Sequence, residues 1–154
     1  MGERTRLGII FPDLEKDLKR LPPAGLRDVA AAAAREANRI IGIANTTVEE
    51  GIAALAGAHY GDPSLTGRLR SLVEELDGIQ WDLQDGVDEG SIEKAAQSKA
   101  FREARAVNAL YYALQANPLE AALEALYEAH AAIQDVPTIR KLLEDSASRF
   151  REEK

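Results

Sequence analysis

The stretch LTGRLRSLVEELDGIQWDL, residues 65–83, decides the fold class. Its large apolar residues recur in steps of four and three, the spacing that places side chains on one face of an α-helix. This apolar row consists of Leu65, Leu69, Leu72, Leu76, Ile79 and Leu83. Because the row covers only about three heptads, it suits a helix in a bundle as well as a coiled coil. It predicts a helix that buries the row against neighbouring helices.

Similar periodicity, interrupted by proline and glycine, predicts the remaining helices. We expect a helix over residues 11–21 with Asp13 as its N-cap, and an alanine-rich helix over 26–58 that bends or breaks at 45–47. Further helices are expected over about 92–116, 117–133 and 138–151, the second of these starting at Asn117 and Pro118. No convincing strand pattern competes. The predicted fold is all-α, an antiparallel bundle of five to six helices with short loops.

The length and composition of the chain favour a single domain, residues 1–154. We expect an N-terminal arm over 1–12 and a solvated C-terminal helix end over 148–154. There are no cysteines, which excludes disulfides and thiolate metal sites and fits a reducing compartment. The apolar run LGIIF, residues 7–11, is too short for a signal-peptide core or a membrane span. A cytoplasmic protein that does not enter a membrane is therefore expected.

Negative charge is concentrated in one acidic segment, residues 74–93. This segment holds eight acidic side chains and no basic one, whereas the rest of the chain holds 18 acidic and 19 basic side chains. The net charge of −7 argues against a nucleic-acid-binding protein, whose affinity depends on clustered Lys and Arg. The acidic segment would instead attract a partner with a basic surface.

Trp81, the only tryptophan, lies within the acidic segment. It is two residues from both Ile79 and Leu83, so on a helix it points about 200° away from the apolar row. A second row of residues follows that direction, and we call it the Trp81 face: Glu74, Gly78, Trp81, Asp85 and Asp88. Tryptophan is a frequent anchor at interfaces, its ring attracts cations, and Gly78 leaves a hollow beside it. The favoured interpretation is a non-enzymatic protein–protein interaction module (a regulator, inhibitor, antitoxin or adaptor) that presents the Trp81 face to a basic partner.

A purely structural role for the same residues is the main alternative. Trp81 would then belong to the core, and the acidic side chains would pair with basic residues of the following helix, namely Lys94, Lys99, Arg102 and Arg105. Exposed ion pairs of this kind contribute only about 0–1 kcal/mol each. This alternative predicts a buried indole.

Two chemical alternatives and one mode of assembly remain open. Metal-dependent phosphohydrolase activity would use Mg²⁺ held by Asp82, Asp85, Asp88 and Glu74; no other cofactor is expected. A small-ligand pocket would be lined by His130, Tyr127, Asn108 and Tyr111. A homodimer is also expected, formed through the alanine-rich helix or the N-terminal arm.

Overall fold

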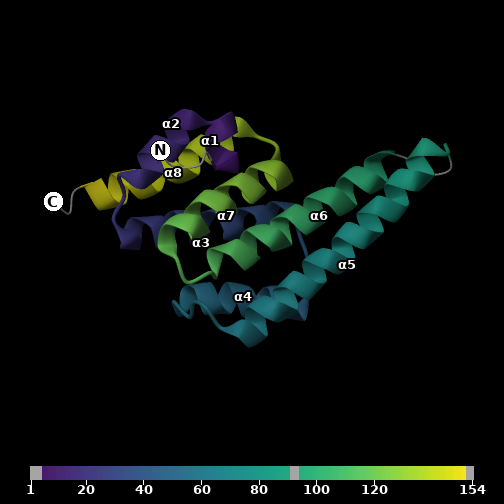
Figure 1. Cartoon of the computed structure of the whole chain (residues 1–154), viewed down its shortest axis with the longest axis horizontal. Coiled ribbons are helices and arrows are strands. Elements are labelled where there is room, and N and C mark those ends of the chain that lie inside the picture. The colour runs from purple at the N-terminus through teal and green to yellow at the C-terminus, as the bar shows by residue number, and fades with distance from the viewer. Residues whose placement is uncertain (1–4, 91–93, 152–154) are drawn as a thin grey trace.

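Helices make up 84% of the residues that the computed structural model describes, which are residues 5–90 and 94–151 (Figure 1). No strand occurs within these two ranges, so the all-α prediction is confirmed. There are eight described helices rather than five or six. They are α1 (Arg6–Ile10), α2 (Pro12–Lys19), α3 (Pro23–Ile41), α4 (Thr46–Ala56), α5 (Pro63–Asp88), α6 (Lys94–Ala113), α7 (Pro118–Ile133) and α8 (Val136–Arg151).

The two additional helices arise from the alanine-rich segment and from the N-terminal arm. The predicted break in the alanine-rich segment occurs, but at residues 42–45 rather than 45–47, because Gly42 ends α3 with a φ of 74° and the Asn45 side chain caps α4. Glycine tolerates this left-handed backbone without steric cost. Within the predicted arm, the Thr5 side chain caps the five-residue helix α1 by accepting a hydrogen bond from the Gly8 amide.

Helix starts follow the sequence signals at two sites and depart from them at a third. Asn117 and Asp62 each cap the helix that begins at the following proline, α7 and α5 respectively. Asp13 was predicted to cap the second helix, and this is wrong, because Phe11 occupies the N-cap position of α2 without a side-chain hydrogen bond. Asp13 instead lies in the first turn and accepts a hydrogen bond from Arg140 of α8 at 2.5 Å. A carboxylate in a first turn is still stabilised by the helix dipole.

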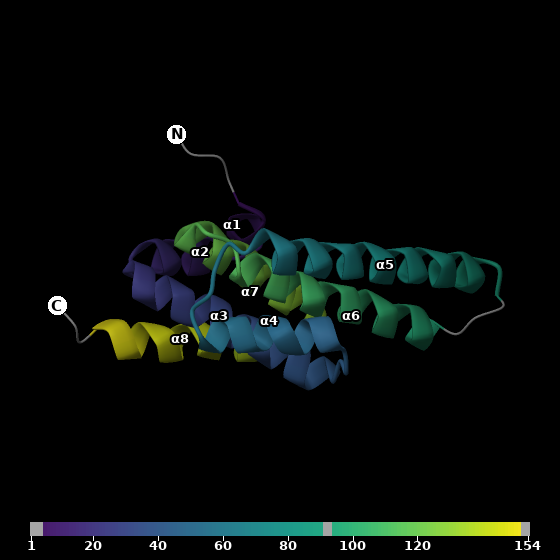
Figure 2. The same cartoon turned by 90° about the horizontal axis from the view of Figure 1, so that it is seen from below.

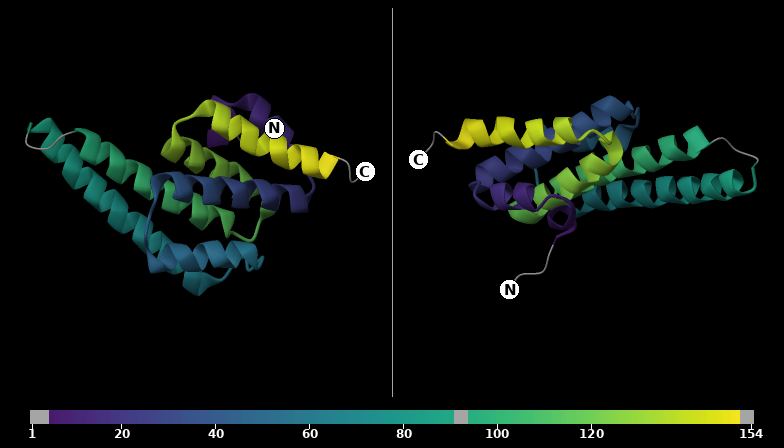
Figure 3. Two further views of the ribbon diagram at one scale, coloured as in Figure 1. Left: turned by 180° about the vertical axis from the view of Figure 1, so that it is seen from behind. Right: turned by 90° about the horizontal axis from the view of Figure 1, so that it is seen from above.

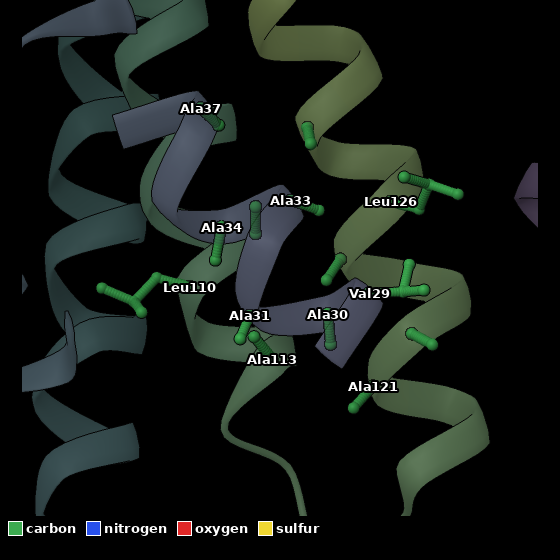
Figure 4. Close-up of a cluster of buried hydrophobic side chains, with 14 of the residues drawn as sticks. Val29, Ala30, Ala31, Ala33, Ala34, Ala37, Leu110, Ala113, Ala121 and Leu126 are labelled. Atoms are coloured by element: carbon green, nitrogen blue, oxygen red, sulfur yellow. The ribbon is translucent and has the colours of Figure 1, made fainter. Parts of the chain in front are cut away.

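The core is built around α3, which packs against both α6 and α7 (Figure 4). The residues of α3 at these contacts are small and fully buried: Val29, Ala30, Ala33, Ala34 and Ala37. Small side chains allow the three helices to approach closely, and alanine also favours the helix itself. This face of α3 is covered within the chain, and the predicted homodimer stays a prediction. Of the N-terminal arm, Ile9 and Ile10 remain exposed.

The buried face of α5 differs from the predicted apolar row in its outer half. Leu65 and Leu69 are buried as predicted, but the contact line then passes through Val73, Leu76, Gln80, Leu83 and Val87. Successive residues on this line, from Leu65 to Val87, are 4, 4, 3, 4, 3 and 4 positions apart. Their average spacing is closer to the 3.6 residues per turn of a straight helix than to the 3.5 of a coiled coil. The prediction was therefore wrong for Ile79, whose side chain is 45% exposed.

The helices α5 and α6 form an antiparallel pair, the α5–α6 hairpin, whose outer end projects beyond the rest of the bundle (Figures 1 and 2). At the other end, α8 packs against α3, with α1 and α2 beside it (Figure 3). In the predicted solvated end, Ser148 and Arg149 are exposed, but Phe150 is half-buried against Gly25; residues 152–154 lie outside the described ranges. No helix in the described part of the chain combines the length and apolar character needed to cross a membrane.

Candidate functional site

The outer half of the α5–α6 hairpin carries Trp81 and most of the acidic segment. Two helices alone cannot enclose a core, and the fully buried residues here are few and small or polar, namely Gln80, Gly86 and Ala100. Leu83 and Val87 are half-buried. The hairpin therefore leaves apolar surface exposed on both sides of its contact line.

Trp81 is 64% exposed, so it does not belong to the core as the structural alternative predicted. The shift of the contact line onto Gln80 places Trp81 about 100° to one side of it, not opposite. Ile79 lies at a similar angle on the other side. All other members of the Trp81 face, Glu74, Gly78, Asp85 and Asp88, are also exposed. The row predicted from the sequence is thus present, on a flank of α5.

Most carboxylates of the acidic segment lack a basic partner within the described residues. Glu74 lies 3.5 Å from Arg70, and Asp88 accepts a hydrogen bond from Gln84 at 2.9 Å. The remaining exposed ones, Glu75, Asp82, Asp85 and Glu89, form no ion pair among the residues that the structure describes; Glu93 lies outside them. Uncompensated charge of this kind costs little in water but attracts a cationic surface.

The predicted pairing of these acids with α6 occurs at one place, between Asp77 and Arg105. Lys94 and Lys99 are exposed and form no ion pair with any described residue. Arg102 binds the end of α7 instead of the acidic segment. Its guanidinium donates to the Ala132 and Ile133 carbonyls at 2.6 and 3.2 Å. Arginine there satisfies backbone carbonyls that the last helical turn leaves free.

Arg105 joins three helices at the base of the hairpin. Its Nη2 atom donates to both carboxylate oxygens of Asp77 at 2.8 Å, and its Nη1 atom donates to Oε1 of Glu128 at 2.7 Å. Asn108 also donates to Glu128. Asp77 lies one helical turn before Trp81, so this network fixes the hairpin to α7 next to the Trp81 face.

Glu128 is the most completely buried charged side chain of this network, with 0% exposure. Burial raises the pKa of its carboxyl, and the attraction of Arg105 and the Asn108 hydrogen bond only partly oppose this rise. Glu128 was not singled out from the sequence, whereas Arg105 was predicted as a partner of the acidic segment, to which Asp77 belongs. The available signal was that Glu128 falls on the alanine row Ala121, Ala125 and Ala132 of α7, where a charge requires a partner.

The basic side chain Arg6, from α1, reaches the same region. Its Nε atom donates to Oε2 of Glu124 at 3.1 Å, and its Nη2 atom lies 3.8 Å from Oε1 of Glu128. The guanidinium carbon is 4.3 Å from the centre of the Tyr127 ring and 5.8 Å from that of Tyr112. The four residues around it, Tyr112, Glu124, Tyr127 and Glu128, are called the Arg6 site below.

The residues of the two chemical alternatives are not brought together. Asp82, Asp85, Asp88 and Glu74 do not form a metal site, because no group of three or more acidic or histidine side chains in the described ranges is placed to hold a metal ion. The four pocket residues contact different partners and line no common pocket among the described residues. His130 packs edge-on against Phe11 with ring centres 5.0 Å apart, Asn108 binds Glu128, and Tyr127 and Tyr111 lie against Arg6 and Arg70 respectively.

His130 is half-buried at the end of α7. Burial lowers the pKa of its imidazole, and its Nδ1 atom is buried without a hydrogen-bond partner among the described residues. A groove of about 910 Å³ between α2 and α8 is lined by none of the residues of either chemical candidate. Its walls carry both charge signs, including Asp13 and Arg140, which bind each other across it. This mixture indicates no particular ligand.

Comparison with known proteins gives no family for this chain. No protein-family model, curated protein or solved structure matches it.

Proposed function

We propose that the chain is a protein–protein interaction module that binds a basic partner protein through the Trp81 face. The observation that carries this proposal is the 64% exposure of Trp81 on a projecting hairpin, among carboxylates that lack basic partners in the described chain. An exposed indole has a hydrophobic cost in water that a partner relieves. Flanking negative charge selects partners with Lys or Arg and accelerates their association.

The role would be regulatory, inhibitory or adaptor-like, in the cytoplasm, and needs no catalytic residue or metal. A partner that normally binds nucleic acid is compatible with this surface, since an acidic face on a rigid helix can compete with a phosphate backbone. A second copy of this chain is a poor occupant of the Trp81 face, because Asp85 and Asp88 of each copy would repel those of the other.

Replacing Trp81 with alanine is expected to weaken partner binding strongly, with little effect on folding. Truncating an aromatic anchor typically costs 2 kcal/mol or more, which is roughly a 30-fold loss of affinity. Affinity capture from the source cell with the native chain and with Trp81→Ala, followed by titration of the captured protein, measures the effect. The melting temperature of the variant should change little, because the side chain is exposed.

Ile79→Ala is the matched control for this experiment. Ile79 is a large exposed apolar residue on the same helix but on the other flank. Its replacement should leave capture intact, whereas Asp85→Asn with Asp88→Asn should weaken capture and reduce its salt sensitivity. Equal binding by Trp81→Ala and the native chain would show that the partner binds elsewhere.

Two exposed glycines of α5 give a second, independent test of the same surface. A Cβ atom at Gly67 or Gly78 would meet nothing within 4 Å. Alanine at either position should therefore raise the free energy of unfolding by about 0.5–1 kcal/mol, because glycine is a poor helix former. Only Gly78 belongs to the Trp81 face, so Gly78→Ala should also weaken partner binding by filling the hollow, while Gly67→Ala should not. Stability is measured by urea unfolding, and a Gly78→Ala variant with unchanged affinity would remove the hollow from the binding surface.

A further inference from the structure

The Arg6 site has the chemistry of a binding site for a guanidinium group. Two tyrosine rings offer their faces at 4.3 and 5.8 Å from the guanidinium carbon, and two carboxylates accept from or lie near its nitrogens. Aromatic faces attract cations, and arginine stacks on them better than lysine does. Glu128 is removed from solvent, so its charge acts on the guanidinium with little screening.

The side chain that occupies the Arg6 site is partly exposed and belongs to a short helix. The helix α1 has five residues, and the Arg6 side chain is 42% exposed. Two apolar side chains, Leu7 and Phe11, anchor this segment in the core, and neither of them depends on the position of the guanidinium. Glu128 keeps Arg105 and Asn108 as partners when Arg6 leaves. Withdrawal of Arg6 therefore leaves no buried charge without a partner.

A continuous path of contacts connects the Arg6 site to the Trp81 face. Glu74 lies 3.5 Å from Arg70, and Arg70 donates to the Tyr111 hydroxyl at 3.4 Å. The Tyr111 and Tyr112 rings meet with their centres 5.2 Å apart, and Tyr112 belongs to the Arg6 site. The same flank of α5 thus carries Trp81 at one end and leads to the Arg6 site at the other.

We infer that the Arg6 site is an arginine-binding site that Arg6 fills within the chain, and that an arginine of the basic partner protein takes the place of Arg6 on binding. The incoming guanidinium makes the same ring contacts and ion pairs that Arg6 gives up, so the exchange loses no type of contact at the site. Arg6 acts as an internal competitor that weakens every partner lacking a well-placed arginine. This inference rests on the proposed function for the identity of the partner, but not for the chemistry of the site.

The inference is tested on the full chain with N-acetyl-arginine amide as a defined probe. Arg6→Ala should bind the probe at least roughly tenfold more tightly than the native chain, the factor expected if Arg6 fills the site nine-tenths of the time. N-acetyl-lysine amide should bind more weakly, because it lacks the planar group that stacks on tyrosine. Adding Glu124→Gln to Arg6→Ala should remove the gain. Binding is measured by isothermal titration and by NMR shifts of the Tyr112 and Tyr127 rings.

Arg70→Ala is the matched control, since Arg70 is an exposed arginine that lies over Tyr111 but contacts no buried carboxylate. It changes the net charge equally and should bring no gain. Arg6→Gln is a second variant that removes the guanidinium from the Arg6 site, and it replaces Arg6→Ala if alanine disturbs α1. The inference is overturned if neither Arg6 variant gains affinity, if Arg70→Ala gains as much, or if Glu124→Gln leaves the gain intact. If Arg6→Ala gains affinity for the arginine probe while Trp81→Ala still captures the partner normally, the Arg6 site is supported and the proposed function of the Trp81 face is rejected.

Discussion

Replacement of Arg105 by methionine is expected to lower the free energy of unfolding by about 3–5 kcal/mol at pH 7, because removing one member of a buried ion pair deprives the other of its main partner. Arg105 is the main partner of Glu128, whose side chain has 0% exposure, and it also binds Asp77 with two hydrogen bonds. Methionine retains much of the volume of the arginine stem, so the loss reports mainly on charge. Urea unfolding followed by circular dichroism measures it.

The cost of Arg105→Met should shrink as the pH falls. The pKa of Glu128 is already raised by burial in the native chain, and it rises further once the arginine has gone. A carboxyl with a raised folded-state pKa binds a proton more readily in the folded protein than in the unfolded one, so its contribution to stability improves as pH falls through that pKa and worsens as pH rises. The difference in free energy of unfolding between the variant and the native chain should therefore narrow as the pH falls from 7 toward the unfolded-state pKa near 4.5.

Two further variants separate the charge of Glu128 from other effects. Arg102→Met removes an arginine from the same helix that binds backbone carbonyls and no carboxylate. Arg102→Met should lower the free energy of unfolding by about 1–3 kcal/mol, and this loss should not vary with pH as the loss in Arg105→Met does. Arg105→Met combined with Glu128→Leu should recover much of the loss, since apolar residues of similar volume often replace a buried pair without penalty. A pH-independent loss in Arg105→Met would show that the arginine acts by packing alone.

The fold class and most helix positions could be predicted because they depend on local signals. Asn117 and Asp62 cap helices with their own side chains, and Asn45 marks the break between α3 and α4. These signals act over a few residues of sequence. The alanines of the long segment likewise indicated a helix with a close neighbour, although they did not indicate that α6 and α7 would cover them.

The candidate site was predictable only in part, since its geometry depends on contacts between distant segments. The Trp81 face follows from spacing along one helix, and its exposure agrees with that prediction. Ile79 was wrongly predicted to be buried, because the prediction assumed the seven-residue repeat of a coiled coil, whereas the contact line follows the 3.6-residue turn of a straight helix. Arg6 and Glu128 are 122 positions apart in the sequence, yet they lie together in the structure. No pattern within one helix could pair them.

Leu110→Ala is expected to lower the free energy of unfolding by about 2–5 kcal/mol, through lost burial and the cavity left behind. Leu110 is fully buried in α6, and it contacts Gly51 of α4 so closely that a Cβ atom there would lie 2.7 Å from its Cδ2 atom and 3.1 Å from its Cγ atom. Gly51→Ala alone should cost about 1–3 kcal/mol, because the buried leucine has no room to move aside.

The two substitutions should partly compensate when combined, because the methyl group that Gly51→Ala introduces enters the space that Leu110 vacates. The double variant should be more stable than the sum of the single losses predicts, by about 1 kcal/mol or more, as expected for residues in direct contact. Guanidinium unfolding of all four proteins measures this coupling. Gly51→Ala paired with Leu126→Ala supplies the control, since Leu126 is equally buried but lies on α7, and that pair should be additive. Additivity for Leu110 as well would mean that α4 shifts as a whole to accommodate the methyl group, so that the close approach of α4 to α6 is not fixed by Gly51.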